Sequence, residues 1–218
     1  MLYDKDIREP LFEFLEETYG KVRFLEEQVM GQSRADIVMV VPDALYGIEI
    51  KSDADSYVRL ERQIQDYDLY YDYNYVVVGT KHGAHIAEHV PEHWGIITVE
   101  QTETGIDFYR MREPKLNHGM QWTNKIEILW RPELAHIQEL NEMPAYKAKS
   151  KRFVADKIVE MVPSVWHYSF QRNFSSVITR RSGRQSRRIV QRTDRSREDV
   201  ADAEKSRKNK CKTVKIMV

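Results

Sequence analysis

Apolar and polar residues follow two different periods along the first half of the chain, and each period predicts one type of element. Apolar side chains recur on one helical face between Ile7 and Leu15, and Gly20 ends that segment. Asp6 followed by Glu9 resembles a capping box. The pattern therefore predicts a helix from about residue 6 to residue 19.

Short runs of apolar and β-branched residues between turn signals predict six strands. These strands are expected at Arg23–Val29, Arg34–Val41, Leu45–Lys51, Asn74–Thr80, Trp94–Glu100 and Ile106–Met111. The run at Asn74–Thr80 is nearly continuous, which is typical of a strand buried on both faces.

Helical spacing returns between these strands. Asp55 or Ser56 can cap a helix that runs to about Asp72, and His82–Val90 predicts a short helix before Pro91. The resulting order, α-β-β-β-α-β-α-β-β, predicts a mixed α/β (α+β) fold in which helices cover a mixed sheet.

The character of the chain changes near residue 113. Two helices are expected in a helical extension over residues 113–170, at Leu134–Glu142 and Lys151–Met161. Residues 171–218 hold 15 Lys/Arg against 5 Asp/Glu, whereas residues 1–170 hold 19 against 29. We expect a core over residues 1–112 and a basic, disordered tail from residue 171, which could bind nucleic acid or remain solvated.

Composition sets the broad class. The 218 residues are 41% hydrophobic, enough for a core, yet no apolar run is long enough to span a membrane. The acidic, amphipathic start differs from a secretory signal. Cys211 is the one cysteine, which excludes an internal disulfide and fits a reducing compartment. A cytoplasmic protein without a membrane partner is expected.

The segment VVPDALY predicts a tight turn centred on Pro42 and Asp43. The numbers of two residues that face each other across the hairpin then add up to 85, so Asp36 lies opposite Glu49. Carboxylates so placed have Cβ atoms about 4.5–5.5 Å apart and repel one another. Such a pair needs a raised pKa or a cation between its members, and all-oxygen ligation suits Mg²⁺.

Lys51 follows Glu49 on the same face of the strand. A lysine ammonium near a metal can orient or activate the attacking water and stabilise charge on a phosphate. The alternative is a salt bridge between Glu49 and Lys51 on a solvated face of the sheet. The presence of Asp36 and the following helix favours the catalytic interpretation.

These residues resemble the PD-(D/E)XK nuclease superfamily, whose fold is that of restriction endonucleases. The resemblance rests on Asp36, on the Glu49-Ile50-Lys51 triplet and on the α-β-β-β-α-β order. Gln63 and Tyr67 match the Q-x-x-x-Y element of the RecB-like branch. The resemblance covers about residues 4–112, and it is to a bacterial branch of these nucleases.

The resemblance implies a Mg²⁺-dependent deoxyribonuclease, with Mn²⁺ as an alternative cofactor. Asp36, Glu49 and the Ile50 carbonyl would hold the metal, and Lys51 would be catalytic. The helix residues of the Q-x-x-x-Y element would brace the site or touch the nucleic acid. A further acid often joins such sites, and Glu27 is our choice over Glu9, Glu13 and Glu26.

Two departures from the family pattern matter. Ala35 stands where the pattern has proline, and the literal Pro42-Asp43 pair falls in the turn at the far end of the hairpin. The sequence does not distinguish DNA from RNA, and a homodimer is compatible with cutting of both strands.

Two other functions remain open from the residues. One is a nucleic-acid-binding module of the same fold that does not cleave. The other is a zinc peptidase, because His85, Glu88 and His89 match H-x-x-E-H, with His93 four residues further on. Pro91 limits that helix to about two turns, so a solvated helix face is favoured.

Two further motifs have competing interpretations. Ser52-Asp53-Ala54-Asp55 could place polar groups near a metal, but helix capping is favoured. The tyrosine-rich run DYDLYYDYNY could stack bases, but a core position is favoured.

Overall fold

A computed structural model of the chain describes residues 2–53, 55–103, 105–161 and 167–180. Its strands are β1 (Arg23–Met30), β2 (Ser33–Val41), β3 (Ala44–Lys51), β4 (Tyr73–Gly79), β5 (Gly95–Gln101) and β6 (Ile106–Arg112). Its α-helices are α1 (Asp4–Tyr19), α2 (Leu60–Tyr70), α3 (Thr80–Gly83), α4 (Trp122–Lys125), α5 (Arg131–Leu140), α6 (Lys151–Met161) and α7 (His167–Thr179). Short 3₁₀ turns are η1 (Tyr57–Arg59), η2 (Ile86–Glu88) and η3 (Ile126–Ile128).

The six strands form one mixed sheet in the order β1-β2-β3-β4-β5-β6. The pairs β1/β2, β2/β3 and β5/β6 are antiparallel, whereas β4 is parallel to both β3 and β5. Central strand β4 is almost entirely buried, as its continuous apolar sequence predicts. The predicted mixed α/β class is confirmed.

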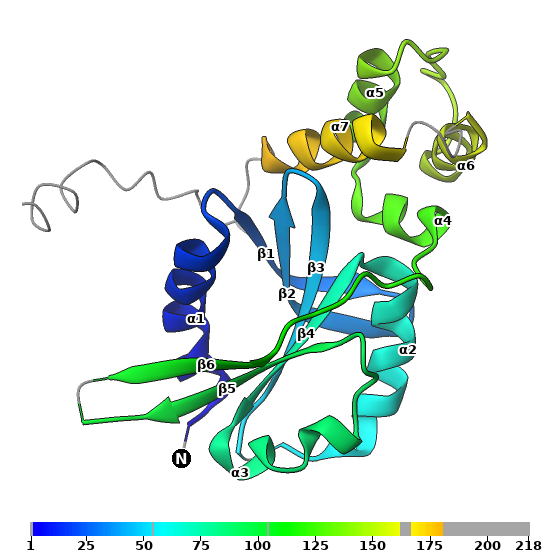
Figure 1. Ribbon diagram of the computed structural model, residues 1–218. Helices are drawn as coiled ribbons and strands as arrows, with labels where there is room; N and C mark the ends of the chain where they lie inside the picture. The colour runs from blue at the N-terminus through cyan, green and yellow to red at the C-terminus, as the bar shows by residue number, and fades with distance from the viewer. Residues whose placement is uncertain (1, 54, 104, 162–166, 181–218) are drawn as a thin grey trace, which may run out of the picture. The chain divides into compact units, whose positions relative to one another are not determined.

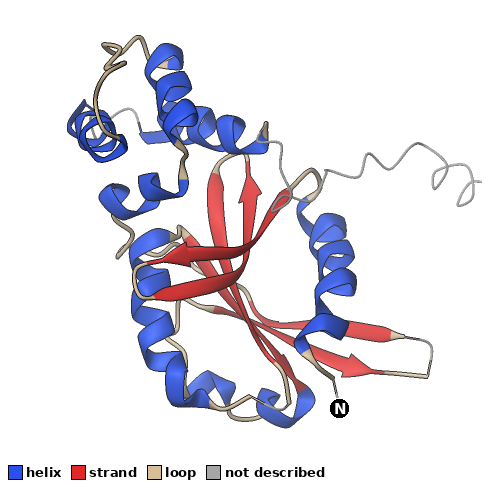
Figure 2. Ribbon diagram, turned by 180° about the vertical axis from the view of Figure 1, so that it is seen from behind, coloured by secondary structure: helices blue, strands red, loops and turns tan. Residues whose placement is uncertain are grey.

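Helices α1 and α2 lie on opposite faces of this sheet, as both views show (Figures 1 and 2). Alternate residues of β3 therefore enter different cores. Ile48 and Ile50 pack with the apolar face of α1, whereas Leu45 packs with Tyr67 and Tyr70 of α2. Residues of β3 that share the α2 face, among them Glu49 and Lys51, thus point to the helix that carries the Q-x-x-x-Y element.

Helix α1 begins at Asp4, about two residues earlier than its sequence predicts. Tyr3 is the N-cap, and its backbone N–H donates to the Asp6 carboxylate at 3.1 Å. Asp6 therefore occupies the third helical position, and the predicted capping box of Asp6 with Glu9 is wrong. The apolar face is as expected, since Ile7, Leu11 and Leu15 are buried.

The predicted helix at residues 55–72 is divided and shorter. It begins as η1, continues as α2 and ends at Tyr70. Neither Asp55 nor Ser56 caps it through a side chain. The Asp55 carboxylate instead accepts hydrogen bonds from the N–H and hydroxyl of Ser52, at 2.9 and 2.7 Å, and closes the turn after β3.

The C-terminal elements correct the predicted tail boundary. Helix α7 continues past Gln171 to Thr179, and it buries Phe170, Phe174 and Ile178. These residues recur at helical spacing, but the boundary drawn at residue 171 from charge alone divides them. Residues 181–218 of the predicted tail lie outside the described residues.

The described helices α4 to α7 belong to the same compact unit as the sheet. Within the described ranges, no helix has the length and apolar character needed to cross a membrane.

Candidate active site

The β2–β3 hairpin has the predicted register. Pro42 and Asp43 form its turn, and the ladder runs from Val41↔Ala44 to Ile37↔Ile48. Asp36 and Glu49 are the next residues on each strand. The Ile50 N–H donates to Asp36 Oδ2 at 2.8 Å, so the Asp36 side chain reaches across to β3.

Glu49 is nearly fully buried, with 2% of its surface exposed, and protein donors bind both oxygens of its carboxylate. Lys51 Nζ lies 2.7 Å from Oε1, and Gln63 Nε2 donates to the same oxygen. Lys51 also donates to Gln63 Oε1 at 2.9 Å, which closes a triangle of the three side chains. This buried arrangement differs from the solvated salt bridge that is the alternative for Glu49 and Lys51.

Tyr67 fills the space where β2 and β3 diverge. Its hydroxyl accepts a hydrogen bond from the Asp36 N–H at 3.3 Å and lies 2.8 Å from Glu49 Oε2 and 3.1 Å from the Ile48 carbonyl. Burial and then the charge of Glu49 raise the pKa of Tyr67 well above its usual value, so the hydroxyl keeps its proton. The two helix residues of the Q-x-x-x-Y element thus contact both strands.

The surroundings of Asp36 disfavour the ionised form of its carboxyl group. Burial, followed by the charge of Glu49, raises the pKa of Asp36 from its ordinary 3.8 to about 8. The hydrogen bond from Ile50 and the charge of Arg8 oppose this shift. A carboxylate that repels its neighbour in this way is stabilised in its charged form by a cation.

Replacing Asp36 with asparagine should therefore stabilise the metal-free chain near pH 8 and have no such effect near pH 4. Because the folded-state pKa lies above the unfolded value, stability falls as pH rises between about 4 and about 8. The slope is at most about 1.4 kcal/mol per pH unit. Because 22% of the Asp36 side chain is exposed, solvent screens part of the effect. We therefore expect stability to fall with rising pH, but with a smaller slope than this maximum.

Urea denaturation of both chains in a divalent-free buffer at several pH values measures the difference. The exposed Asp43, replaced by asparagine, is the matched control and should show no pH-dependent gain. A variant at position 36 that is less stable than wild type at pH 8 would contradict the argument.

Glu27 lies beside Asp36 on the neighbouring strand. The β1–β2 pairing includes Glu26↔Ile37 and Gln28↔Ala35 but skips the position between them, where Glu27 would face Asp36. Glu27 has a φ of 54°, which is uncommon for a residue with a side chain and is typical of a strained position near a site. The predicted third acid therefore lies at the same level of the sheet as the other two.

Arg8 is a residue that the sequence analysis missed. From α1 it donates to Glu27 Oε1 at 2.7 Å and to the Asp36 carbonyl at 3.0 Å, and it pairs with Asp4 at 2.7 Å. The spacing of Asp4 and Arg8 along one helix face was a visible signal, but the approach of α1 to β2 was not.

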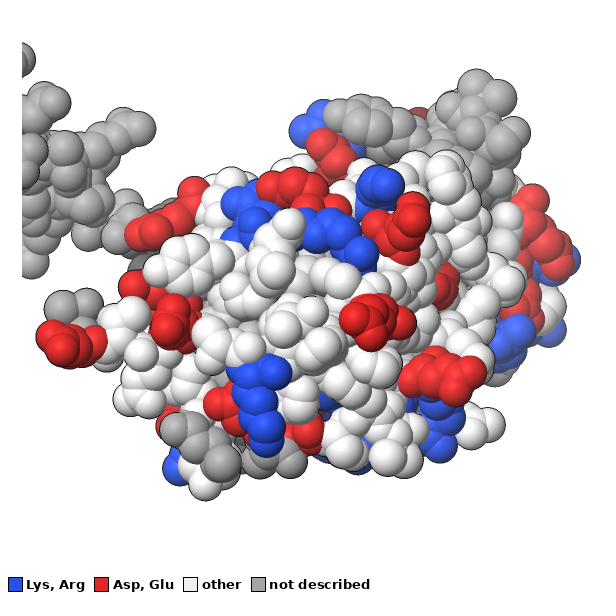
Figure 3. All heavy atoms as spheres, turned by 60° about the horizontal axis from the view of Figure 1, so that its bottom comes forward, with Lys and Arg blue, Asp and Glu red and all other residues white. Residues whose placement is uncertain are grey.

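These residues line a cleft with a volume of about 510 Å³. Its lining consists of Asp4, Arg8, Glu27, Gln32, Ser33, Arg34, Asp36, Glu49, Ile50, Lys51, Asp55, Arg59, Arg62 and Gln63. Five of these are Lys/Arg and five are Asp/Glu. On the face of the molecule seen in Figure 3, Lys and Arg side chains also alternate with Asp and Glu side chains rather than forming a patch of one sign.

The carboxylates have acceptor capacity left for one divalent cation. Glu49 Oε1 already accepts two hydrogen bonds, but among the described residues only Tyr67 donates to Oε2. Asp36 Oδ2 accepts one from Ile50, whose carbonyl points to the same side of β3 as its N–H. Because no group of three or more His, Cys, Asp or Glu in the described ranges has metal-binding geometry, such an ion would complete its shell with water, as Mg²⁺ commonly does.

The histidine motif does not have the geometry that a zinc peptidase requires. The predicted helix at His82–Val90 is broken, because α3 ends at Gly83 and η2 covers only Ile86–Glu88. His85 and His89 are therefore not successive residues of one helix face. His85 lies 3.4 Å from Glu88 on the surface, and the His89 ring packs on Tyr57.

Other rival motifs have structural roles in this fold. His93 Nε2 lies 3.0 Å from Asp68 Oδ1. Tyr67, Tyr71 and Tyr75 of the tyrosine-rich run are fully buried, as favoured.

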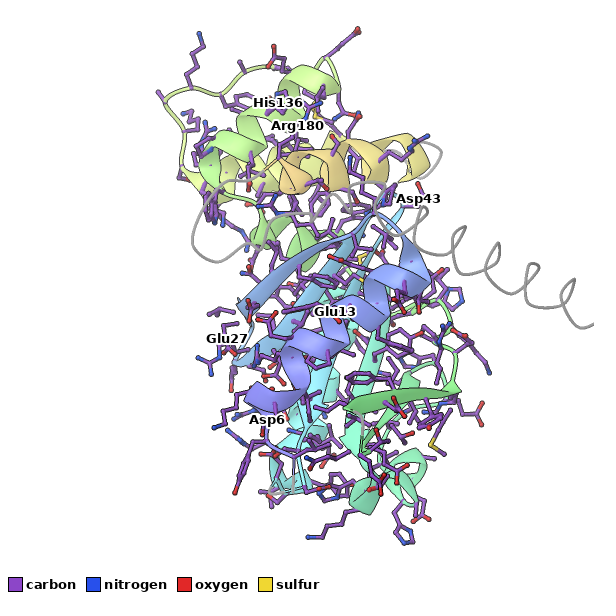
Figure 4. All side chains as sticks on the ribbon, turned by 90° about the vertical axis from the view of Figure 1, so that its left-hand side faces the viewer. Asp6, Glu13, Glu27, Asp43, His136 and Arg180 are labelled. Carbon is purple, nitrogen blue, oxygen red and sulfur yellow. The ribbon has the colours of Figure 1, made fainter. Side chains whose placement is uncertain are left out.

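Asp43 lies at the end of the hairpin next to α7, away from Glu27 (Figure 4). The literal Pro42-Asp43 pair thus belongs to the turn, as expected. Glu9 and Glu13 are exposed on α1, so neither lies in the cleft.

Comparisons with known proteins give one family and one distant structure. A family model described as "Bacteriophage P4 protein cII" matches residues 2–206. A search of curated proteins finds no match. The solved structure of Pyrococcus furiosus SfsA in complex with Ca²⁺ matches 51% of this chain and 60% of its own, at 16% identity and a TM-score of 0.31. A likeness at that level carries no argument about function.

Proposed function

We propose that this chain, which belongs to the bacteriophage P4 cII family, is a metal-dependent nuclease that hydrolyses DNA phosphodiester bonds. We assign it a restriction-endonuclease-like core. The observation that carries the proposal is the meeting of Asp36, Glu49 and Lys51 at one end of a hairpin, on the floor of an open cleft. Two repelling acids beside a buried lysine cost stability, and a hydrolytic site explains why they are kept together.

The acids would hold Mg²⁺ or Mn²⁺ through Asp36, Glu49 and the Ile50 carbonyl. When bound, such an ion polarises a phosphate oxygen and lowers the pKa of water. Lys51 carries an ammonium with three donors, of which Glu49 and Gln63 take two. The third donor is left to orient the attacking water or to stabilise charge that develops on the phosphate.

Gln63 and Tyr67 would act as positioning residues. Together with Lys51 they fix the Glu49 carboxylate through three hydrogen bonds, so that its orientation is set before substrate arrives. Preorganised groups of this kind spend no free energy on reorientation during the reaction. Glu27 would add negative charge at the same level of the sheet.

Cleavage assays on circular plasmid, linear duplex and single-stranded DNA test the proposal. Wild-type chain and Glu49→Gln should be compared in Mg²⁺, in Mn²⁺ and in EDTA. We expect cleavage that needs a divalent ion and is lost in the variant. Metal-independent DNA binding without cleavage would favour a non-catalytic module of the same fold.

Arg59 and Arg62 should contribute to the binding of the nucleic-acid backbone. Both line the cleft from η1 and α2, both are exposed, and neither has an ion pair or hydrogen bond with another described residue. Affinity for DNA falls as salt rises, and each lost phosphate contact makes the plot of log affinity against log salt less steep by about 0.9 on duplex DNA. The double change to glutamine should therefore reduce the slope by about 2.

Fluorescence anisotropy in Ca²⁺ at several salt concentrations measures this slope. Arg152 and Lys157 on α6, outside the cleft, provide a matched double change to glutamine. Equal effects of the two double variants would contradict a role for the cleft arginines.

A further inference from the structure

Arg8 lies where α1 meets the floor of the cleft, and it contacts acids from three elements. Its Nε donates to Asp4 Oδ2 at 2.7 Å and its Nη2 to Glu27 Oε1 at 2.7 Å. Its Nη1 donates to the Asp36 carbonyl at 3.0 Å, and Nη2 also lies 3.5 Å from Asp36 Oδ1. Only 13% of the side chain is exposed, so the guanidinium is held in place.

The position of Arg8 matters because three carboxylates stand at one level of the sheet. Glu27, Asp36 and Glu49 occupy neighbouring positions on β1, β2 and β3. Such a row needs positive charge on both sides of Asp36. Lys51 supplies it at Glu49, and Arg8 supplies it between Glu27 and Asp36.

We propose, as an inference that rests on the proposed function, that Arg8 replaces a second metal ion in this site. Arg8 is then a positioning residue that supplies the counter-charge of Glu27 and Asp36. The site takes a single divalent cation, held by Asp36 and Glu49.

The contacts of Glu27 explain why a second ion does not enter. Two-metal sites hold their ions about 3.5–4 Å apart, so the second would need Glu27 beside Asp36. Glu27 Oε1 already accepts from Arg8, and Oε2 lies 2.6 Å from Arg34 Nε. That second contact is an ion pair, because Glu27 Oε2 has no hydrogen-bond partner among the described residues.

Charge balance leads to the same conclusion. The lining already holds equal numbers of Lys/Arg and Asp/Glu, so one divalent ion makes the cleft net positive and attractive to phosphate. Without Arg8, Glu27 Oε1 and Asp4 Oδ2 would lose their donor, and Asp4 Oδ1 would still have no hydrogen-bond partner among the described residues. Those oxygens could then accept a second ion.

Mn²⁺ binding to the full chain tests the inference without reference to cleavage. Isothermal titration gives the stoichiometry, and electron paramagnetic resonance detects magnetic coupling between paired ions. We expect one Mn²⁺ in wild type and in Arg8→Lys, two in Arg8→Gln, and one again in Arg8→Gln with Glu27→Gln. The lysine variant keeps the charge and guards against a merely structural effect.

Two coupled ions in the wild type would overturn the inference and leave the proposed nuclease standing. A single ion in folded Arg8→Gln would also overturn it. No Mn²⁺ binding by the wild type would overturn both the inference and the proposed function.

Discussion

Replacing Lys51 with methionine should lower the Mg²⁺-dependent cleavage rate by about 10²–10³-fold, the usual effect of removing one donor aimed at developing charge. Methionine keeps most of the volume of the lysine stem, but it removes the ammonium that Glu49 and Gln63 hold in place. Since only 3% of Lys51 is exposed, water cannot easily replace the lost cation. Single-turnover cleavage of plasmid DNA with excess protein measures the effect.

The exposed Lys81, replaced by methionine, is the control and should leave the rate unchanged. Rates must be compared per folded molecule, because the change of Lys51 to methionine removes a hydrogen-bond donor from buried Glu49 and so lowers the stability of the chain. A folded methionine variant at position 51 that cleaves within about threefold of wild type would show that the lysine is not part of the chemistry.

Replacing Lys125 with methionine should destabilise the chain by about 3–5 kcal/mol, the cost of breaking a buried ion pair. Lys125 is fully buried, and its Nζ lies 2.7 and 2.6 Å from the two oxygens of Asp72. Burial lowers the pKa of Lys125, and the charge of Asp72 opposes this. Without the lysine, Asp72 would stay buried with its charge uncompensated.

Lys125 also donates to Gln171 of α7, and its ammonium lies 4.4 Å from the centre of the Trp122 ring. The loss should therefore appear in urea denaturation as a lower midpoint. Asp72→Asn in the same chain should recover part of it, because no unpaired charge remains and the Leu45 N–H keeps an acceptor. A loss below about 1 kcal/mol, within the range of an exposed pair, would contradict this account.

The two buried lysines thus separate stability from activity. Lys125 lies outside the cleft lining, whereas Lys51 lies within it. We expect the Lys125 variant to cleave normally per folded molecule at a temperature where it remains folded.

The sequence was sufficient to predict the β2–β3 hairpin and its register. A turn at Pro42-Asp43 and the two-residue period of strands place Asp36 against Glu49 without further information. The helical period likewise places Gln63 and Tyr67 on one face of α2. Local rules of this kind do not depend on distant parts of the chain.

Other features depend on contacts between distant segments. Arg8 reaches Asp36 only because α1 packs against the sheet, and its spacing along the helix does not reveal that approach. The irregular backbone at Glu27 interrupts a ladder that its sequence predicts to be continuous. Helix α7 is not evident from the sequence, because the basic residues after Gln171 indicate a solvated tail while Phe170, Phe174 and Ile178 recur at helical spacing.

The most direct test of the central claim compares two aspartates of the same hairpin. Mg²⁺-dependent plasmid cleavage should be measured for wild type, Asp36→Asn and Asp43→Asn, each with an EDTA control. Asp43 is exposed at the turn, 3.8 Å from Arg172, whereas Asp36 lines the cleft. We predict that cleavage is lost in Asp36→Asn and kept in Asp43→Asn. Equal activity in the two variants would contradict the assignment of the active site to this end of the hairpin.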